Sequence, residues 1–569
     1  MTDTAVAKPQ ASNSPELGSP VLELADRFWQ WFLARQPMYA TVLGDERYDD
    51  RLSDPSAEGR HEEVAGLKGF LEDASQISRD GLAQEDAITL NMLEVVARIW
   101  LRQQAHDVHH FEAIDQMAGP QNLAGDMSRF QRLDTPERMD RAIRRLEAFP
   151  GYLAAHRANL LDGIAAGRTA AAPVVARVIE QTRRAATATV DESPLVIAHP
   201  ELTGESRDRL REAIERNVQP ALADHLAALE GYAEFAREGE GVWALPDGEA
   251  LYATMILAST TLEETPRAIH DYGIEQLDLI RNETAEIAKE LGYVDTAAMR
   301  EALDADKGNY AKDGAEIVER AGRQIDSANA LAPGLFGRLP IATCEVRAVE
   351  PYQEAEAPPA FYFPPAPDGS RGGIYYVNTY QPENRPLHRL ATTTYHEATP
   401  GHHFQIAIES ELTDLPDFRR FGSRLTGAAY AEGWGLYSER LADEMGLFET
   451  PWERLGMLDA QAWRAARLVV DTGIHAFRWS RDRSVQLLLS IGLSQLEAET
   501  ETDRYITWPG QALAYMTGMR EIVALRKQLE KRDGDLFDIV NFHDEMLGHG
   551  TLPLATLRRE LPDWVNARR

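Results

Sequence analysis

Apolar residues recur at helical spacing over most of this chain. Near its start, the run from Leu22 to Leu33 places large apolar side chains on one helix face, and Pro37 ends the run. Thr261 and Glu264 have the spacing of a capping box before a later helix. Further helices are predicted at 136–166, 204–238, 262–292, 386–412, 418–446, 452–497 and 511–531. This pattern predicts a mostly α-helical protein without a solenoid repeat.

One segment, residues 339–381, breaks the helical pattern. It contains CEVRAVEPY, AFYFPP and GGIYYVNTY, separated by proline and glycine, which is typical of short strands. We therefore expect a small β-sheet inserted into a helical architecture of two lobes with a cleft between them. Residues 1–18 read as a flexible tail, and residues 19–569 read as a single two-lobed helical domain.

Composition narrows the classes of function. Of 569 residues, 59 are Lys or Arg and 91 are Asp or Glu, so the formal charge is −32. This acidic balance argues against binding to nucleic acid or to anionic lipid. The lone cysteine, Cys344, excludes an intrachain disulfide and a thiolate metal site, so any metal must be held by histidine and carboxylate. No signal peptide and no transmembrane run is evident, which predicts a cytoplasmic protein.

The segment TTTYHEATPGHHFQ, residues 392–405, carries the most chemical information. The zinc-binding pattern H-E-x-x-H needs a histidine four residues after His396, but Pro400 stands there. On a regular helix, His402 would lie about 120° off the face of His396, and His403 about 10.5 Å further along the axis. Zinc bonds of about 2.0–2.1 Å cannot bridge these separations, so an undisturbed helix makes no chelate.

Pro400 cannot sit inside an undisturbed helix, because it removes a hydrogen bond and clashes with the preceding turn. A bulge over 398–401 would bring His402 to the usual position of the second histidine. We expect His402 to be this ligand, with His403 as the alternative. A surface or capping role for these histidines is the competing interpretation.

A third ligand is predicted in AAYAEGWGLYSER, residues 428–440. Glu432 lies 30 residues after His402, and its neighbours look buried, so its carboxylate needs a partner such as a cation. Glu439 falls on the same helix face two turns later. It is expected to accept a hydrogen bond from a ligand histidine, or else to be a plain surface charge.

Four blocks occur in this order: HEATPGHHFQ, AYAEGWGLYSERL, RLVVDTGIHAFRW and PGQALAYMTG. Together they resemble the bacterial family of domain of unknown function 885 (DUF885), which is grouped with the gluzincin-type zinc metallopeptidases. The family is similar in architecture to helical oligopeptidases and carboxypeptidases. The resemblance implies a zinc peptidase. Many members carry a lipoprotein or secretory leader, which is not evident in this sequence.

The later blocks supply candidates for the rest of a site. His475, four residues after Asp471, could donate to an oxyanion, or it could pair with that aspartate for structure alone. The Tyr515 hydroxyl could play the same donor role, or Tyr515 could be a core aromatic. Tyr376 and Asn378 alternate to one face of an expected edge strand, where they could contact an extended peptide, or be an ordinary sheet pair.

The leading hypothesis is a hydrolase with one zinc per chain that cleaves amide bonds of short peptides. His396, His402 and Glu432 would hold zinc, which lowers the pKa of its bound water, and Glu397 would be the general base. A zinc amidohydrolase acting on a small non-peptide amide uses the same site. A non-catalytic binding scaffold with a degenerate motif is the third alternative, although a scaffold has no need of Glu397 as a base.

Overall fold

The computed structural model describes residues 18–350, 354, 357–366, 369 and 371–567. The predicted tail, residues 1–18, lies outside the described residues except for Gly18. The protein is mostly helical with one small three-stranded sheet, which confirms this part of the predicted fold class.

The amino-terminal part of the chain, up to the sheet, contains fourteen α-helices among its described residues. Their bounds are α1 (Pro20–Arg35), α2 (Pro37–Val42), α3 (Ala57–Gln76), α4 (Gln84–Gln104), α5 (Leu123–Phe130), α6 (Pro136–Ala166), α7 (Ala172–Thr187), α8 (Pro194–Ile197), α9 (Gly204–Ala213), α10 (Gln219–Tyr232), α11 (Gly248–Thr260), α12 (Pro266–Glu290), α13 (Thr296–Ala305) and α14 (Gly314–Leu331). A π-helical turn, Ile214–Val218, joins α9 to α10 inside the single stretch predicted at 204–238.

The carboxy-terminal part of the chain contains the other ten α-helices of the described residues. Their bounds are α15 (Leu390–Glu397), α16 (His402–Glu411), α17 (Asp417–Phe421), α18 (Ala429–Glu444), α19 (Pro451–His475), α20 (Arg481–Ser490), α21 (Gln495–Thr507), α22 (Ala514–Asp533), α23 (Ile539–Gly548) and α24 (Leu554–Ala567).

Several helices differ from the prediction: 386–412 and 418–446 are each two helices, and at two other places local capping overrides the apolar period. The stretch predicted at 452–497 is three helices, since Ser480 caps α20 and Ser494 forms a capping box at α21. The capping box predicted at Thr261 was wrong. Thr261 ends α11 in the left-handed region, and Thr265 caps α12 by accepting from the Ala268 amide.

The sheet comprises β1 (Cys344–Ala348), β2 (Ala360–Phe363) and β3 (Gly373–Val377), all within the predicted segment. The spatial order is β1-β3-β2, with β1 parallel and β2 antiparallel to β3. The prediction that β3 is an edge strand was therefore wrong. Its backbone is paired on both sides, so the sheet's outer edges belong to β1 and β2.

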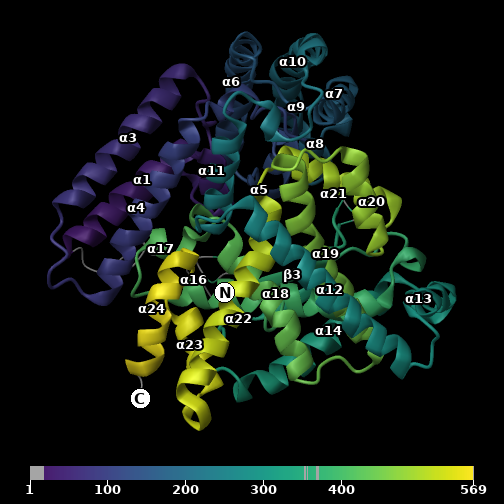
Figure 1. The fold of residues 1–569 in the computed structure, drawn as a ribbon. Coiled ribbons are helices and arrows are strands. Elements are labelled where there is room, and N and C mark those ends of the chain that lie inside the picture. Colours follow the sequence, from purple (N-terminus) through teal and green to yellow (C-terminus); the bar gives the residue numbers. More distant parts are fainter. Residues whose placement is uncertain (1–17, 351–353, 355–356, 367–368, 370, 568–569) are drawn as a thin grey trace, which may run out of the picture.

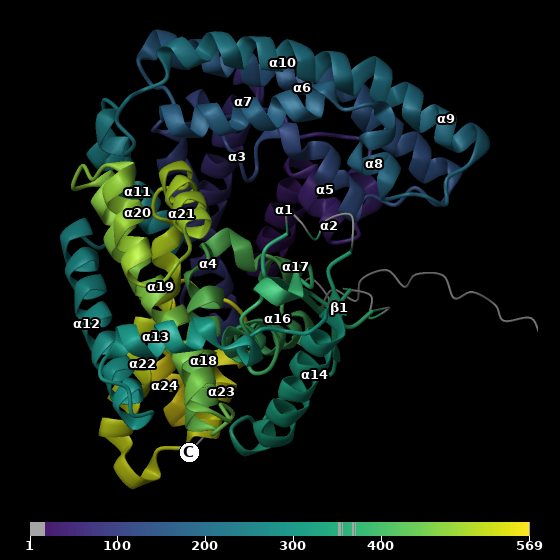
Figure 2. The same ribbon diagram turned by 90° about the vertical axis from the view of Figure 1, so that its right-hand side faces the viewer.

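The helices gather around α18 and α19. In Figures 1 and 2, α6, α7, α9 and α10 form one end of the molecule, while α1, α3 and α4 lie together at one side in Figure 1. The largest apolar core joins both halves of the chain, from Ile88 on α4 to Trp434 on α18 and Val565 on α24. Consequently α18 is buried along most of its length and carries its polar residues into the interior. The division into two lobes stays a prediction.

Close backbone contact fixes α18 against α22. A Cβ atom on Gly433 or on Gly518 would collide with the backbone of the opposite helix, so only glycine allows this crossing. Within the described residues, no helix is both long enough and apolar enough to span a bilayer.

Candidate metal centre

The helix that carries His396 stops immediately after Glu397. Pro400 cannot continue it, and Ala398 leaves the helical region with φ −105° and ψ −112°. A Cβ atom on Gly401 would collide with the carbonyl oxygens of His396 and Tyr395, so this turn requires glycine. A new helix, α16, then begins at His402. The expected bulge is thus a complete break between two helices.

The break brings His396 and His402 face to edge. Their ring centroids are 4.7 Å apart and the rings are nearly perpendicular. The Nε2 atom of each ring lies 3.5 Å from the same Oε2 atom of Glu432, which α18 supplies. Three side chains from three helices therefore converge on one point, as the motif spacing predicted.

This donor set fits zinc. Two imidazoles and one carboxylate are the ligands of many catalytic zinc sites. With bonds of about 2.0–2.1 Å, the edges of a tetrahedral zinc site are about 3.3–3.4 Å long. The 3.5 Å separations match that edge and are longer than a good hydrogen bond. Both histidine-to-glutamate separations are thus compatible with ligands of a shared ion.

The electrostatics of the three side chains are coupled. Burial alone would raise the pKa of Glu432, but the two neighbouring imidazoles outweigh it and hold that pKa well below its ordinary value. Burial alone would lower the pKa of His396, but Glu432 and Glu439 raise it to about 9. A proton occupies this site when no cation does, so a metal ion would have to displace it.

Glu439 orients His396 through the ring nitrogen opposite Glu432. Its carboxylate is buried, and Oε1 accepts a 2.8 Å hydrogen bond from Nδ1 of His396. Its other oxygen accepts from the Gln461 side chain at 2.9 Å. With Nδ1 donating in this way, Nε2 is the ring nitrogen of His396 that faces Glu432 and the one that would coordinate a metal ion after losing its proton. This is the role predicted for Glu439, whereas Gln461 was missed because it lies on α19, outside any motif.

Gly435 is a second residue that the sequence reasoning missed. It lies on α18 between the two glutamates, and a Cβ atom there would be 2.8 Å from Cε1 and Nε2 of His396. Only glycine leaves room for the imidazole at this point. The signal was present in the glycine three residues after Glu432, on the same helix face.

Glu397 lies beside the cluster. It ends α15 and is half-buried. One of its oxygens and one ring nitrogen each of His396 and His402 lie within 4.8 Å of one another. Glu432 contacts both Nε2 atoms more closely, so Glu432 fits the ligand position and Glu397 is left available to handle a proton.

His403, the alternative second ligand, points away from the cluster. Its Nδ1 atom accepts from the Tyr362 hydroxyl at 2.9 Å, and its Nε2 donates to the Ala342 carbonyl at 3.0 Å. Burial lowers its pKa to about 4, so the ring is neutral. His403 therefore attaches α16 to the sheet.

His475 is not at the cluster, so its expected donor role was wrong. Its Nδ1 accepts from the Val242 amide at 3.1 Å, and its Nε2 donates to the Tyr505 carbonyl at 2.9 Å. On α19 it lies 14 residues, or about 21 Å, beyond Gln461, which contacts Glu439. Both ring nitrogens are occupied by backbone groups, so the histidine packs the end of α19 against its neighbours.

Tyr515 is the second residue of α22, three residues before the crossing with α18 at Gly518. The guanidinium of Arg467 lies 4.4 Å from its ring centroid, and that of Arg464 lies 5.9 Å away. Its hydroxyl has no hydrogen-bond partner in the part of the chain that the structure describes, so it stays available as a donor.

Tyr376 and Asn378 do not lie on an edge strand, since β3 is internal, and their contact with a peptide stays a prediction. Asn378 is buried, and its amide donates to the carbonyl oxygens of Glu354 and Ala357 at 2.7 and 3.0 Å. Tyr376 stacks on Phe361 with ring centroids 5.0 Å apart. Both residues organise the sheet and its loop, and their pairing partners leave no free edge beside them.

Comparison with known protein families gives a match to one family model. The family described as "Bacterial protein of unknown function (DUF885)" matches residues 37–561. The chain belongs to this family. The four sequence blocks predicted this membership, and it is confirmed. The cluster of His396, His402 and Glu432 thus lies within the DUF885 region.

Two solved structures are similar to this chain. A protein of Colwellia psychrerythraea, described as a "putative lipoprotein", is 27% identical, with 96% of this chain and 99% of that one covered and a TM-score of 0.91. A "putative lipoprotein of unknown function" of Shewanella oneidensis is 19% identical, with 95% and 99% covered and a TM-score of 0.76, which shows the fold alone. A comparison with curated proteins returns no match.

Proposed function

We propose that this DUF885 protein is a gluzincin-like zinc hydrolase that cleaves amide bonds of short peptides. The observation that supports it is the convergence of two imidazole Nε2 atoms on one carboxylate oxygen, with a second carboxylate beside them. A peptide is the expected substrate, because a metal site next to a proton acceptor is what amide hydrolysis needs.

His396, His402 and Glu432 would hold the ion. When bound, zinc lowers the pKa of water and polarises a carbonyl group. Glu439 keeps the first histidine in the tautomer whose Nε2 can coordinate, since it accepts from Nδ1. Gly435 leaves the space in which this imidazole sits.

Glu397 handles the proton. Its carboxylate accepts the proton of the attacking water and later delivers it to the nitrogen that leaves, so the residue ends the cycle ionised as it began. Its half-buried position beside the two histidines supports this role. Tyr515 would donate its hydroxyl proton in a hydrogen bond to the oxygen of the scissile carbonyl. An extended peptide would pair with an outer strand, β1 or β2, since β3 is internal.

The test combines metal analysis with peptide cleavage. Purified protein is expected to hold one zinc per chain and to cleave members of a peptide library, and a chelator should abolish both. The Glu397→Gln variant is the matched control, because an amide has the carboxylate's shape but cannot accept a proton. It should keep zinc and lose nearly all turnover.

Other results would contradict the proposal. Stoichiometric zinc with no turnover on any peptide would favour a binding scaffold, and turnover only on small non-peptide amides would favour an amidohydrolase. Activity of Glu397→Gln within a few-fold of the natural protein would remove Glu397 from the role of base. The cytoplasmic location stays a prediction, and both similar structures are described as lipoproteins.

A further inference from the structure

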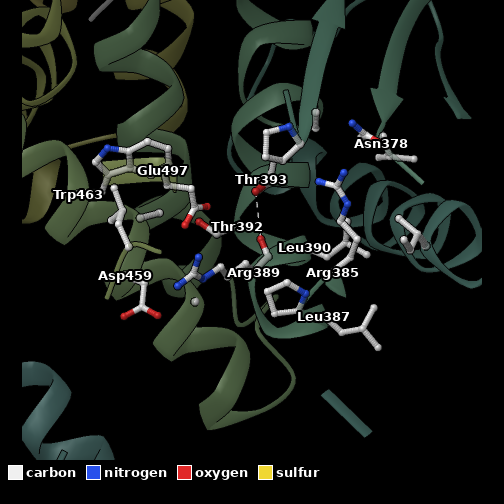
Figure 3. Close-up of a pocket in the computed structure, with 18 of the residues that line it drawn as sticks. Asn378, Arg385, Leu387, Arg389, Leu390, Thr392, Thr393, Asp459, Trp463 and Glu497 are labelled. Atoms are coloured by element: carbon white, nitrogen blue, oxygen red, sulfur yellow. Dashed lines mark hydrogen bonds between the residues drawn. The ribbon is translucent and has the colours of Figure 1, made fainter. Parts of the chain in front are cut away.

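A cavity of about 200 Å³ lies beside the first turns of α15, the helix that carries His396, and no residue of the candidate metal centre lines it. It lies between the sheet, the start of α15 and the middle of α19 (Figure 3). Arg389, Thr392 and Thr393 line it from α15 and its first turn. At about 100° per residue, Thr392 and Thr393 lie within about 60° of His396 around the helix and about one turn before it, and Arg389 stands just before the helix begins. Cavity and cluster therefore follow each other along one face of α15.

Three arginines in the cavity lack a carboxylate partner. Arg385, Arg389 and Arg464 line it, and none forms an ion pair within the described ranges of the chain. The Nε atoms of Arg389 and Arg464 are buried without any hydrogen-bond partner. By contrast Arg467, one turn further on α19, is paired with Glu501 at 2.9 Å. Among the residues that the structure describes, the three arginines donate only to backbone carbonyls, of Tyr380, Gly492 and Ala460, and such guanidinium groups in a cavity of so acidic a chain indicate an anionic ligand.

The two acidic residues in the cavity are already engaged. Asp459 pairs with Arg300 at 2.6 Å and lies 3.7 Å from Nε2 of His388. Glu497 accepts from the Ser494 amide at 2.8 Å as part of the capping box of α21. Asp459 is thus committed to Arg300 and one oxygen of Glu497 to the cap, while the cavity holds three arginines without a carboxylate partner, so it favours the carboxy-terminal end of a peptide.

Much of the rest of the lining is apolar. Ile317, Leu390, Trp463, Ile491 and Leu493 form much of the wall. A ligand suited to this cavity carries a carboxylate and an apolar group close to each other. The carboxy-terminal residue of a peptide has both.

We propose that this cavity binds the carboxy-terminal residue of the substrate, with its free carboxylate on Arg389 and Arg464 and its apolar side chain against Trp463. This inference rests on the proposed hydrolase function and makes the protein a peptidase that removes residues from the carboxy terminus.

The distance between the cavity residues and His396 determines how many amino-acid residues the cleavage would release. Thr393 and Arg389 precede His396 by three and seven residues, which is about 4.5 and 10.5 Å along the helix axis. An extended peptide advances about 3.3–3.6 Å per residue. The carboxylate would therefore lie one to three residues beyond the bond that is cut, and the products would be single amino acids, dipeptides or tripeptides.

The experiment compares two peptides that differ only at the carboxy terminus. Peptides ending in leucine are supplied as the free acid or as the amide, and products are identified by mass spectrometry. The acid should be cleaved within three residues of its end, with the amide slower by about 10- to 100-fold in kcat/KM, because one charged hydrogen-bonded contact is lost. Arg389→Gln and Arg464→Gln should slow the acid by a similar factor, mainly through KM, and leave the amide unchanged.

The matched control is Arg454→Gln, which removes an exposed guanidinium of the same helix, paired with Asp443, and should change nothing. Three results would overturn the inference while the hydrolase proposal stands. They are equal rates for the acid and the amide, cleavage at internal bonds, and an equal loss of kcat/KM on both peptides in the arginine variants.

A binding measurement separates the two proposals if no peptide is cleaved. Calorimetry with N-acetyl-leucine and N-acetyl-leucinamide then tests the cavity alone. Binding of the acid only, lost in Arg464→Gln, would support the cavity assignment although the hydrolase proposal has failed. Equal binding of acid and amide, or no binding of either, would overturn it.

Discussion

Gly435 lies directly against the imidazole of His396. A Cβ atom at position 435 would be 2.8 Å from the ring's Nε2, closer than side-chain atoms normally approach. The contact connects α18, which supplies Glu432 and Glu439, to α15, which supplies His396 and Glu397. The position of the first candidate ligand therefore depends on the absence of a side chain on the neighbouring helix.

The first prediction concerns this contact. Gly435→Ala should displace the imidazole and lower zinc content well below one ion per chain, as elemental analysis would show. Gly322→Ala on α14 is the control, because its Cβ would meet nothing within 4 Å. This control should keep zinc and gain about 0.5–1 kcal/mol in helix stability. Full zinc occupancy in Gly435→Ala would show that the site tolerates a shifted ring.

The second prediction separates the neighbouring histidines. His402→Ala should lose stoichiometric zinc, because its Nε2 faces Glu432 at 3.5 Å. His403→Ala should keep zinc and lose about 1–3 kcal/mol of stability, since the Ala342 carbonyl and the Tyr362 hydroxyl lose their partner. Metal analysis with urea unfolding would check both. Loss of zinc in His403→Ala alone would reverse the ligand assignment.

The third prediction tests Tyr515. If its hydroxyl stabilises the developing oxyanion, Tyr515→Phe should lower kcat by about 10²–10³ with little change in KM and with zinc at one per chain. His475→Gln is the comparison, because both ring nitrogens of His475 bind backbone groups about 21 Å along α19 from Gln461. The His475→Gln variant should lower the free energy of unfolding and leave kcat unchanged at a temperature at which the variant stays folded. Normal kcat in Tyr515→Phe would exclude the hydroxyl from the reaction.

The fourth prediction concerns pH and stability. Burial raises the pKa of Glu409 to about 7, although Thr551 and Gln405 donate hydrogen bonds to it. The folded state therefore keeps a proton that the unfolded state has released. This contribution to stability is fully present below about pH 4.5 and is lost as pH rises through about 7, by at most about 1.4 kcal/mol per pH unit.

Glu409→Gln has no such proton, and the unpaired Oε1 atom of Gln405 can accept from its amide. The difference in unfolding free energy between the natural protein and this variant should therefore fall from pH 4.5 to pH 7.5. Denaturant unfolding at several pH values measures it. Parallel curves would mean that Glu409 titrates normally in the folded protein.

Local features of the chain were sufficient for several parts of the result. The helical period, the strands between 339 and 381 and the ligand candidates His396 and His402 follow from short patterns, because each depends on residues a few positions apart. Glu432 follows from its apolar neighbours and from its position 30 residues after His402. Pro400 also predicts a helix break between His396 and His402, since a regular helix does not continue through proline here. The family blocks, spread over the chain, were enough to predict membership.

Tertiary contacts decided the rest. The order β1-β3-β2 places β3 inside the sheet. The sequence of a short strand does not determine which strands will pair with it. His475 and Glu439 both read as polar residues on buried helices, yet one faces backbone groups and the other faces His396. Side-chain partners across helices depend on how the helices pack. The sequence by itself therefore determined which residues were candidate metal ligands, and the packing of α15, α16 and α18 decided which of them meet.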